Sequence, residues 1–399
     1  MTKEKGIPQI RFSGFTDTWE QRELGDMGRT YTGLSGKTKD DFGHGQARFV
    51  TYMNVFSNPI CNSEMTEPIE IDSKQNEVEI GDVFFTTSSE TPEEVGMSSV
   101  LLKKQGKTYL NSFCFGFRPS EKIDSYYLAY MLRSEAIREK IILLAQGISR
   151  YNISKNKVME IAVSLPSLDE QAQIGQYFTH LDRLITLHQR KYDKLTKVKK
   201  AMLEKMFPKN GSLYPEIRFK GFTDAWEQRK LSAIADKVTE KNVGLQYIET
   251  FTNSAEFGII SQRDFFDHDI AKMSSLGGYY IVRSEDFVYN PRISTSAPVG
   301  PINRNKLGRI GVMSPLYTVF RPHDIDTTYL EYFFKSKYWH SFMNFNGDSG
   351  ARSDRFSIKD SVFFEMPIPI PHIDEQKKIG AFLDKLDSLI TLHQRKPFC

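Results

Sequence analysis

One long segment of the sequence occurs twice, and this repetition decides the fold. Residues 165–191 read LPSLDEQAQIGQYFTHLDRLITLHQRK, and residues 370–396 read IPHIDEQKKIGAFLDKLDSLITLHQRK. The last eight residues of each copy, Leu184–Lys191 and Leu389–Lys396, are identical. Self-similarity at a fixed separation is typical of a chain built from repeated units. The segment therefore predicts a tandem repeat of about 205 residues.

A second repeated block opens each half. Residues 8–23 read PQIRFSGFTDTWEQRE and residues 215–230 read PEIRFKGFTDAWEQRK, with twelve of sixteen positions identical. Weaker matches follow in the same order: Phe117-Arg-Pro with Phe320-Arg-Pro, and Arg150-Tyr-Asn-Ile with Arg355-Phe-Ser-Ile. Residues 26–80 and 232–283 share almost nothing. A common frame with a diverged interior favours two similar sites that read different things, over a neutral duplication that drifted.

The repeated segment has the signals of a long helix. Pro166 or Pro371 ends the preceding element, and Asp169 or Asp374 can cap the first turn. The pattern predicts a helix over residues 169–206, about 57 Å long. Apolar residues recur along it at spacings of three and four, as in a coiled-coil seam: Ile174, Tyr177, Phe178, Leu181, Leu184, Ile185, Leu187, Tyr192, Leu195, Val198, Met202 and Met206.

The second copy of the segment is the natural partner of this helix, in an antiparallel or a parallel orientation. His188 and His393 occupy equivalent positions, and we interpret them as polar residues that specify the register rather than as metal or catalytic groups. The predicted coiled-coil and partner-contacting residues are Ile174, Phe178, Leu181, Ile185, His188, Tyr192, Leu195, Ile379, Leu383, Leu386, Ile390 and His393.

Each repeated segment and the residues that follow it form the tail of its repeat. The first tail is basic and the second is shorter. From Arg183 to Lys209 there are nine Lys or Arg residues against two acidic ones, which fits either a solvated flank or a face that attracts phosphate or a partner. Cys399 aligns with Lys194, so we expect the distal helix to stop early. Some apolar residues of the first helix would then lack a partner within the chain: Leu195, Val198, Met202 and Met206. We expect the purified chain to self-associate or to be poorly soluble, and the alternative is that the helix frays beyond Tyr192.

The segments before each tail mix strand and helix patterns, so we predict an α+β fold with two globular domains and two long coiled-coil helices. Strands are predicted at 48–56, 82–87, 113–117, 279–282, 286–290 and 316–320, and helices at 124–145 and 326–345. The predicted organisation is a first recognition domain at 1–164, a central helix at 165–208, a second recognition domain at 209–369 and a shortened distal helix at 370–399.

Composition limits the class of protein. The 399 residues carry 53 basic and 50 acidic side chains, so a nucleic-acid surface must be a local concentration of charge. Cys61, Cys114 and Cys399 have no metal-ligand or disulfide spacing. No 18-residue apolar window and no secretion signal occur, and we expect a cytoplasmic protein without a membrane contact.

Motifs for catalysis are absent from the sequence. Gly36-Lys37-Thr38 lacks the earlier glycine of a phosphate-binding loop, because residue 31 is Tyr. Tyr289-Asn-Pro-Arg292 begins like the motif of amino-methyltransferases but has Arg where a second Pro belongs. Asp72-Ser-Lys74 lacks the upstream acid of a nuclease site. We therefore predict a non-catalytic chain that binds no metal and no cofactor.

Polar and basic residues in the diverged parts are the candidates for contact with nucleic acid. Arg, Asn and Ser read base edges or bind phosphate. In the first repeat the candidates are Lys37, Lys39, Arg48, Thr51, Asn54, Ser88, Ser89, Arg150, Tyr151, Asn152 and Lys155. In the second repeat they are Asn253, Arg263, Tyr289, Asn290, Arg292, Arg304, Arg309, Arg352, Arg355 and Lys359.

These repeats resemble the specificity subunit of type I restriction–modification systems over essentially the full length. The resemblance rests on (I/L)-P-x-(I/L)-D-E-Q-x-x-I-G before each long helix and on Arg-Phe-x-Gly-Phe…Trp-Glu at the start of each half. It implies recognition domains at about 1–160 and 213–368, and conserved helices at 165–207 and 370–399. Each domain would read one half of a bipartite site in double-stranded DNA, and the helices would set the spacer.

The resemblance also implies partners. Two methyltransferase subunits would supply S-adenosylmethionine chemistry on adenine, and restriction/translocase subunits would supply cleavage with ATP and Mg. An alternative from another class is a two-domain adaptor whose diverged loops bind proteins, which the near-neutral charge allows.

Overall fold

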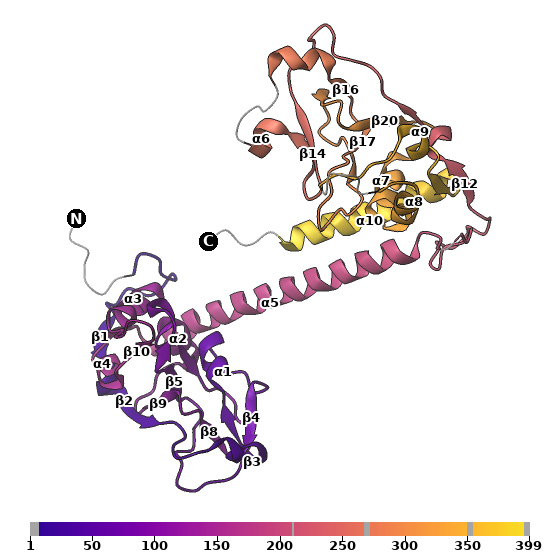
Figure 1. Ribbon diagram of the computed structural model, residues 1–399. Coiled ribbons are helices and arrows are strands. Elements are labelled where there is room, and N and C mark those ends of the chain that lie inside the picture. The colour runs from indigo at the N-terminus through magenta and orange to yellow at the C-terminus, as the bar shows by residue number, and fades with distance from the viewer. Residues whose placement is uncertain (1–7, 210, 267–271, 349–353, 395–399) are drawn as a thin grey trace. The chain divides into compact units, whose positions relative to one another are not determined.

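The computed structural model describes residues 8–209, 211–266, 272–348 and 354–394 (Figure 1). The chain divides into two compact units, Met1–Thr186 and Leu187–Cys399. The division falls inside one continuous helix, α5 (Leu168–Lys205), close to the bounds expected from its periodicity. Within the described ranges, no helix is both long and apolar enough to span a membrane.

The first unit combines eleven described strands with four short helices and the start of α5. The strands are β1 (Glu20–Glu23), β2 (Gly28–Thr32), β3 (Phe42–Val50), β4 (Thr66–Ile69), β5 (Val83–Thr86), β6 (Ser88–Ser89), β7 (Ser98–Val100), β8 (Thr108–Leu110), β9 (Cys114–Pro119), β10 (Tyr151–Asn152) and β11 (Ala162–Leu165). The helices are α1 (Tyr52–Ser57), α2 (Ser125–Met131), α3 (Glu135–Leu143) and α4 (Lys155–Met159).

The second unit repeats this plan with different loops. Its strands are β12 (Glu227–Lys230), β13 (Ala235–Lys237), β14 (Phe251–Ser254), β15 (Gly258–Ser261), β16 (Tyr280–Val282), β17 (Phe287–Tyr289), β18 (Ile302–Arg304), β19 (Gly311–Met313), β20 (Thr318–Pro322) and β21 (Pro367–Ile370). Its helices are α6 (Gln262–Phe266), α7 (Thr327–Lys335), α8 (Tyr338–Asn346), α9 (Asp360–Phe363) and α10 (Ile373–Gln394).

Corresponding four-stranded antiparallel sheets lie at the centre of the two units, in the orders β2-β9-β5-β7 and β13-β20-β17-β18. The short sequence matches mark shared ion pairs on these sheets. Arg118 binds Asp82 through two bonds of 2.8 Å, and Arg321 binds Asp286 at 2.8 and 2.9 Å. The α+β fold predicted from the sequence is confirmed.

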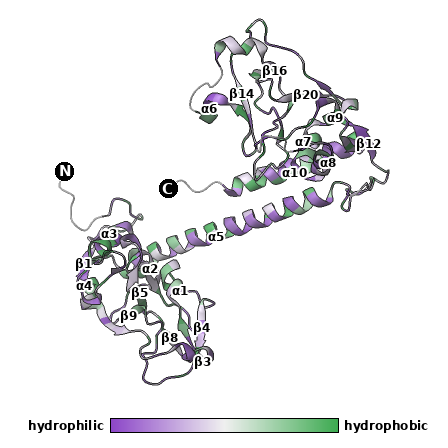
Figure 2. Cartoon of the chain, in the orientation of Figure 1, coloured by the Kyte–Doolittle hydropathy of each residue, from purple (hydrophilic) through white to green (hydrophobic). Residues whose placement is uncertain are grey.

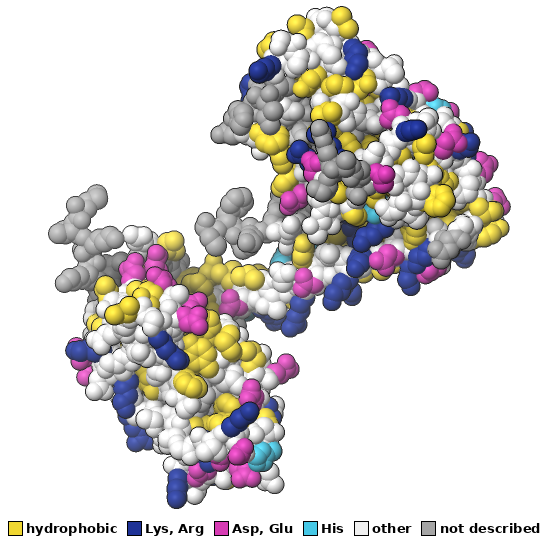
Figure 3. All heavy atoms as spheres, viewed as in Figure 1, with side chains coloured by type: hydrophobic (Ala, Val, Ile, Leu, Met, Phe, Trp, Pro, Cys, Tyr) yellow, Lys and Arg dark blue, Asp and Glu magenta, His cyan; other side chains and the backbone are white. Residues whose placement is uncertain are grey.

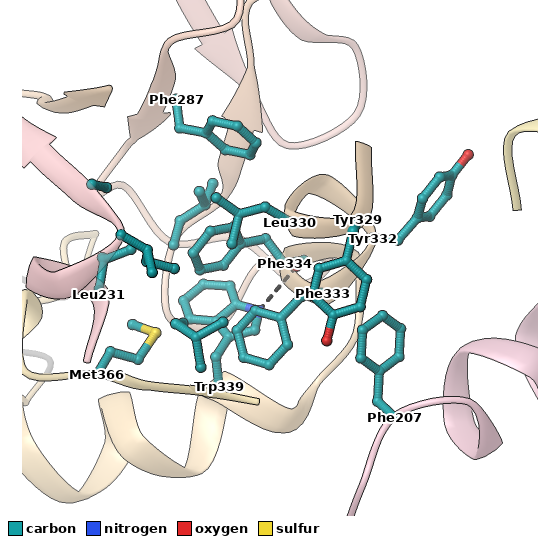
Figure 4. Close-up of a cluster of buried hydrophobic side chains, with 14 of the residues drawn as sticks. Phe207, Leu231, Phe287, Tyr329, Leu330, Tyr332, Phe333, Phe334, Trp339 and Met366 are labelled. Carbon is teal, nitrogen blue, oxygen red and sulfur yellow. Dashed lines mark hydrogen bonds between the residues drawn. The ribbon is translucent and has the colours of Figure 1, made fainter. Parts of the chain in front are cut away.

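Aromatic side chains fill the core of the second unit. Phe287, Phe320 and Phe334 lie together between the sheet and α7, and Trp339 donates to the carbonyl of Phe334 at 2.9 Å (Figure 4). Phe207, just past the end of α5, is fully buried in the same cluster. The end of α5 is therefore part of the core of the second unit.

The repeated Asp-Glu-Gln signature fixes the start of each long helix. Glu170 is buried and accepts two bonds of 2.7 Å from Arg11 of the opening block, while Glu375 accepts two from Arg218 at 2.7 and 2.8 Å. The next residue, Gln171, accepts from the Asp124 backbone N–H and donates to the Pro166 carbonyl. The opening block and the Asp-Glu-Gln motif of each repeat are thus bonded to each other. We call this contact the clamp, and each unit has one.

The second half of α5 packs antiparallel against α10. His188 meets His393 with Nδ1 atoms 2.9 Å apart, and Lys199 forms an ion pair with Asp387 nearer the start of α10. Leu195, Val198, Met202 and Leu203 pack on a buried cluster that includes Ile379, Leu383 and Leu386, and Met206 is buried in it. The expectation that this stripe lacks an intramolecular partner is wrong, because the antiparallel direction places it against α10.

A stripe at the other end of α5 is exposed instead. Figure 2 shows hydrophobic residues recurring among hydrophilic ones along this helix. The exposed members in the first half are Tyr177, Phe178, Leu181, Leu184 and Ile185, and Leu187 follows just past the midpoint. Because its premise has failed, the self-association expected from Leu195–Met206 has no support in the fold.

The predicted local elements agree with the structure except in one segment. The helical patterns at 124–145 and 326–345 are the helix pairs α2–α3 and α7–α8. The predicted strand at 48–56 ends at Val50, and its second half is the helix α1. The side chain of Thr51 accepts from the Asn54 backbone N–H and caps that helix, which overrides the apolar pattern.

Candidate nucleic-acid interface

In each unit, a short segment after the helix pair α2–α3 or α7–α8 pairs with a segment just after the sheet strand β5 or β17, and we call this pairing the frame. In the first unit Tyr151 pairs with Ser89 and Asn152 with Ser88, and Arg150 directly precedes this pairing. In the second unit Arg292 pairs with Arg355, and the Phe356 N–H donates to the Pro291 carbonyl at 2.7 Å. The two Arg-containing motifs singled out in the sequence therefore occupy corresponding places.

A hollow of about 700 Å³ opens beside this frame in the first unit, and we call it the first hollow. Arg150 Nη2 donates to Ser88 Oγ at 3.1 Å, and the Tyr52 hydroxyl donates to the Ser88 carbonyl at 2.8 Å. Burial, and less strongly the charge of Glu94, raise the pKa of Tyr52. Its lining residues are Tyr52, Met53, Phe56, Ser88, Ser89, Glu90, Glu94, Ser149 and Arg150.

A hollow of about 540 Å³ lies at the corresponding frame of the second unit, and we call it the second hollow. Two of its lining residues belong to an amide network: Asn290 donates to the Asn253 carbonyl at 2.8 Å, and Asn303 donates to Asn253 Oδ1 at 2.7 Å. The lining residues include Thr252, Asn253, Ser254, Gln262, Phe265, Phe266, Tyr279, Asn290, Pro291, Arg292, Ser294, Ser314, Leu316, Tyr317 and Arg355.

Several predicted site residues come together at these hollows. Ser88, Ser89 and Arg150 line the first one, with Tyr151 and Asn152 on the adjoining strand. Asn253, Asn290, Arg292 and Arg355 line the second one. Arg150 and Arg292 are exposed, and Arg355 is partly exposed, so their guanidinium groups are accessible to a ligand.

Other predicted residues of the first unit support the fold away from the hollow. Lys37 pairs with Asp72 at 2.9 Å, and that bond raises the pKa of the lysine. Arg48 donates to Thr66 Oγ1 at 2.6 Å, and the fully buried Asn54 donates to the carbonyls of Asn62 and Met65. Thr51 is the cap of α1.

The second unit has a similar group of structural residues among the candidates. Tyr289 is buried and donates to the Val299 carbonyl at 2.9 Å, and burial raises its pKa. Arg304 is buried between Glu285 and Glu331. Arg309 binds Glu249 at 2.7 Å. Candidates that are exposed but do not line a hollow are Lys39, Lys155, Arg263 and Lys359. Arg352 lies outside the described residues.

The sequence reasoning missed the aromatic and amide residues of the hollows. Tyr52 and Phe56 in the first unit, and Gln262, Phe265 and Phe266 in the second, were not among the candidates. The sequence QRDFFD at residues 262–267 could have indicated an exposed aromatic residue. Two adjacent Phe residues among charged ones seldom both face a core.

The long helices carry the predicted coiled-coil residues in two environments. Ile379, Leu383 and Leu386 are buried, with Leu195 packed on them, whereas Phe178, Leu181 and Ile185 are exposed. The remaining predicted members are Ile174, His188, Tyr192, Ile390 and His393, of which His188 is exposed and the others are half-buried. Figure 3 shows Lys and Arg side chains along α5, with hydrophobic ones gathered on the first unit.

The described residues offer no group of three or more His, Cys, Asp or Glu side chains that could hold a metal ion. Cys61 and Cys114 are buried thiols, and burial raises the pKa of each to about 12. The hollows are lined instead by hydrogen-bonding, charged and aromatic side chains.

A family model described as the type I restriction modification DNA specificity domain matches residues 16–197 and again residues 224–397. Over 429 aligned residues the chain is 24% identical to the type I restriction enzyme MjaX specificity subunit of Methanocaldococcus jannaschii, covering 99% of this chain and 92% of that protein. The MjaVIII specificity subunit of the same organism is 26% identical over 314 residues, covering 74% of this chain and 71% of that protein.

A solved structure has a similar fold. The crystal structure of a type I restriction–modification system S subunit from M. genitalium aligns over 97% of this chain and 94% of that one, with a TM-score of 0.54 and 11% sequence identity.

Proposed function

The chain belongs to the family of type I restriction–modification DNA specificity domains and carries that domain twice, and from this we propose that each repeat reads one half of a bipartite DNA sequence. The observation that carries the proposal is the pair of hollows. They lie at corresponding places on a shared frame, but different side chains line them. Such a design reads two unlike half-sites with one architecture.

The side chains at the hollows support readout of double-stranded DNA. Arg150 in the first unit and Arg292 and Arg355 in the second have the fork of donors that binds guanine edges or phosphate. The lining of the second hollow carries two Arg and no acidic residue among the described ones, which attracts the phosphate backbone.

We propose that catalysis resides in partner subunits. Two methyltransferase subunits would bind S-adenosylmethionine, and restriction/translocase subunits would use ATP and Mg. The exposed apolar residues in the first half of α5 and the row of basic residues along it support a docking role for the long helices. In this proposal α5 and α10 also set the spacer between the half-sites.

Salt dependence of DNA binding tests the proposal against a protein-binding adaptor. The chain, assembled with its methyltransferase partners, is titrated with duplex DNA at several salt concentrations. We expect the logarithm of affinity to fall linearly with the logarithm of salt, by about 0.9 per neutralised phosphate. Absence of DNA binding, or an affinity that does not respond to salt, would instead favour the adaptor.

A further inference from the structure

The second hollow has aromatic walls that readout of base edges does not require. Phe265 and Phe266 of α6 are 41% and 38% exposed, and their rings meet edge to face with centroids 4.6 Å apart. Both line the hollow, together with Tyr279 and Tyr317. Exposed apolar rings in a hollow with a polar rim mark a binding surface.

A buried amide in the same hollow lacks a donor. Gln262 is only 8% exposed, and its Nε2 donates to the Phe251 carbonyl at 3.3 Å. Its Oε1 accepts no hydrogen bond from any described residue. A buried acceptor without a partner is unfavourable, so this oxygen fits a ligand that brings an N–H group.

The rim of the hollow suits the sugar-phosphate backbone. Arg292 stands on the rim with a side chain 67% exposed, and Asp354, 4.0 Å away, is the only ion-pair partner found for it among the described residues. The Asn290 amide is held on both sides, donating to the Asn253 carbonyl and accepting from the Arg292 N–H. Arg292 is thus more exposed than the two Phe rings, and the unpaired amide oxygen is buried.

A stacked duplex cannot use this arrangement. It presents base edges and phosphates, whereas an aromatic ring binds the flat face of a base. Resting on the proposed function, we propose that the second hollow takes one nucleobase out of the stack of its half-site. The base would lie on Phe266, which Phe265 contacts edge to face, and its exocyclic amino group would donate to Gln262 Oε1. Adenine, cytosine and guanine have such a group.

The first hollow lacks these features. Its two rings, Tyr52 and Phe56, stack on each other at 5.9 Å with an interplanar angle of 19°, so their inner faces are occupied. None of its described lining residues has a buried side-chain polar atom without a partner. Glu90 and Glu94 add negative charge to it. The inference therefore concerns the second half-site only.

Mismatch scanning tests the inference, because unpairing costs least where the base is already mismatched. Once the recognised sequence is known, each base pair of both half-sites is mismatched by changing one strand at a time, and binding of the assembled complex is measured. At one position of the second half-site, we expect five- to tenfold tighter binding. At positions read in the duplex, mismatches should weaken binding or leave it unchanged.

Variants of the hollow connect that position to the named residues. Phe266→Ala should remove the tightening and weaken binding of the matched duplex five- to tenfold, and Phe266→Tyr should restore both. Phe345, 90% exposed on α8 outside the hollow, gives the control variant Phe345→Ala, which should behave as wild type. Replacing the base by an analogue without its amino group should weaken wild type but not Gln262→Leu.

The outcomes separate the two proposals. Sequence-dependent binding in which no mismatch tightens the complex, or tightening that Phe266→Ala leaves intact, overturns base extrusion and leaves the proposed function standing. Absence of any sequence preference in DNA binding overturns the proposed function itself.

Discussion

Arg150 and Arg355 hold corresponding positions in the two repeats, yet their surroundings differ. Arg150 donates to Ser88 beside the stacked Tyr52 and Phe56, whereas Arg355 lies near Asp354 and opposite Arg292. Residues that recur between the repeats form the clamps and the ion pairs of the two central sheets. Residues that line the hollows differ, as the proposed readout of two different sequences requires.

Replacing Arg150 tests readout by a single side chain. We expect Arg150→Ala to weaken binding of the recognised duplex by about 1–3 kcal/mol, the cost of a lost base contact. Arg150→Lys should not restore it, because Lys lacks the planar fork. Lys39→Ala removes an exposed charge outside the hollow and should leave sequence preference unchanged. Full rescue by Lys would assign Arg150 to phosphate.

Gly175 is the glycine of the Asp-Glu-Gln-x-x-Ile-Gly motif, and replacing it tests how closely α5 approaches the start of α2. A Cβ at this position would lie 2.7 Å from the Tyr127 nitrogen and from Tyr126 Cβ. Helix propensity alone would make Gly175→Ala stabilising by about 1 kcal/mol. We expect a net loss of about 1–2 kcal/mol, because overpacking costs more than that gain. Urea unfolding measures it, with Gly244→Ala, whose nearest neighbour is 3.7 Å away, as the control. Stabilisation by Gly175→Ala would contradict the close approach.

Single residues also show where sequence reasoning stops. Lys37, Arg48 and Asn54 have the right chemistry for DNA, but their side chains bond to Asp72, Thr66 and Asn62, which lie 8 to 35 positions away in sequence. No local pattern reveals these bonds. The repeated blocks predicted the two-unit α+β fold and the long helix, because repetition and helical periodicity are visible without contacts. Phe265 and Phe266 were missed because apolar residues are first assigned to a core.

The pair α5 and α10 shows which properties of a helix its sequence predicts and which it does not. Periodicity predicted α5 and its seam, but it left open the direction of the partner, and the wrong stripe was expected to lack a partner. Two contacts together fix the direction, because Lys199 lies after His188 in α5 whereas its partner Asp387 lies before His393 in α10. The His188–His393 contact agrees with the interpretation of the histidines as register residues.

Leu383→Ala tests the packing of α10 on α5. Leu383 is fully buried in the cluster with Leu386 and the second half of α5. Its truncation should cost about 2–5 kcal/mol of stability in the second unit. Urea unfolding followed by the fluorescence of Trp226 and Trp339 measures this. Leu392→Ala, on the same helix but 59% exposed, should change stability by less than about 0.5 kcal/mol. Equal effects would show that this seam does not stabilise the unit.

The helix pair should weaken in acid. Burial first, then the charge of Lys191 and the neighbouring His188, lower the pKa of His393. The folded state therefore binds fewer protons than the unfolded state, and stability that is present at neutral pH is lost as pH falls below about 6.5.

A variant isolates this contribution. His340 also has a pKa lowered by burial, so the quantity of interest is the difference between proteins. His393→Asn should show a smaller loss of melting temperature between pH 7.5 and 5.5 than wild type. His372→Asn, an exposed control, should match wild type. Identical pH profiles for wild type and His393→Asn would exclude the pair as an acid-sensitive contact.

At the scale of the whole molecule, the duplication separates two tasks. Each unit has its own sheet, clamp and hollow, and within the described residues the two hollows share no lining residue. The family assignment gives both units the same role in DNA specificity. The central claim is that the two units read independently.

Methylation mapping tests independent reading most directly. Genomic DNA is mapped from cells that express the chain with the proposed methyltransferase subunits, using wild type, Arg150→Ala and Arg355→Ala. We predict a two-part motif with a fixed spacer in which Arg150→Ala relaxes one part only and Arg355→Ala relaxes the other only. A single undivided motif, or equal relaxation of both parts by either variant, would contradict the account.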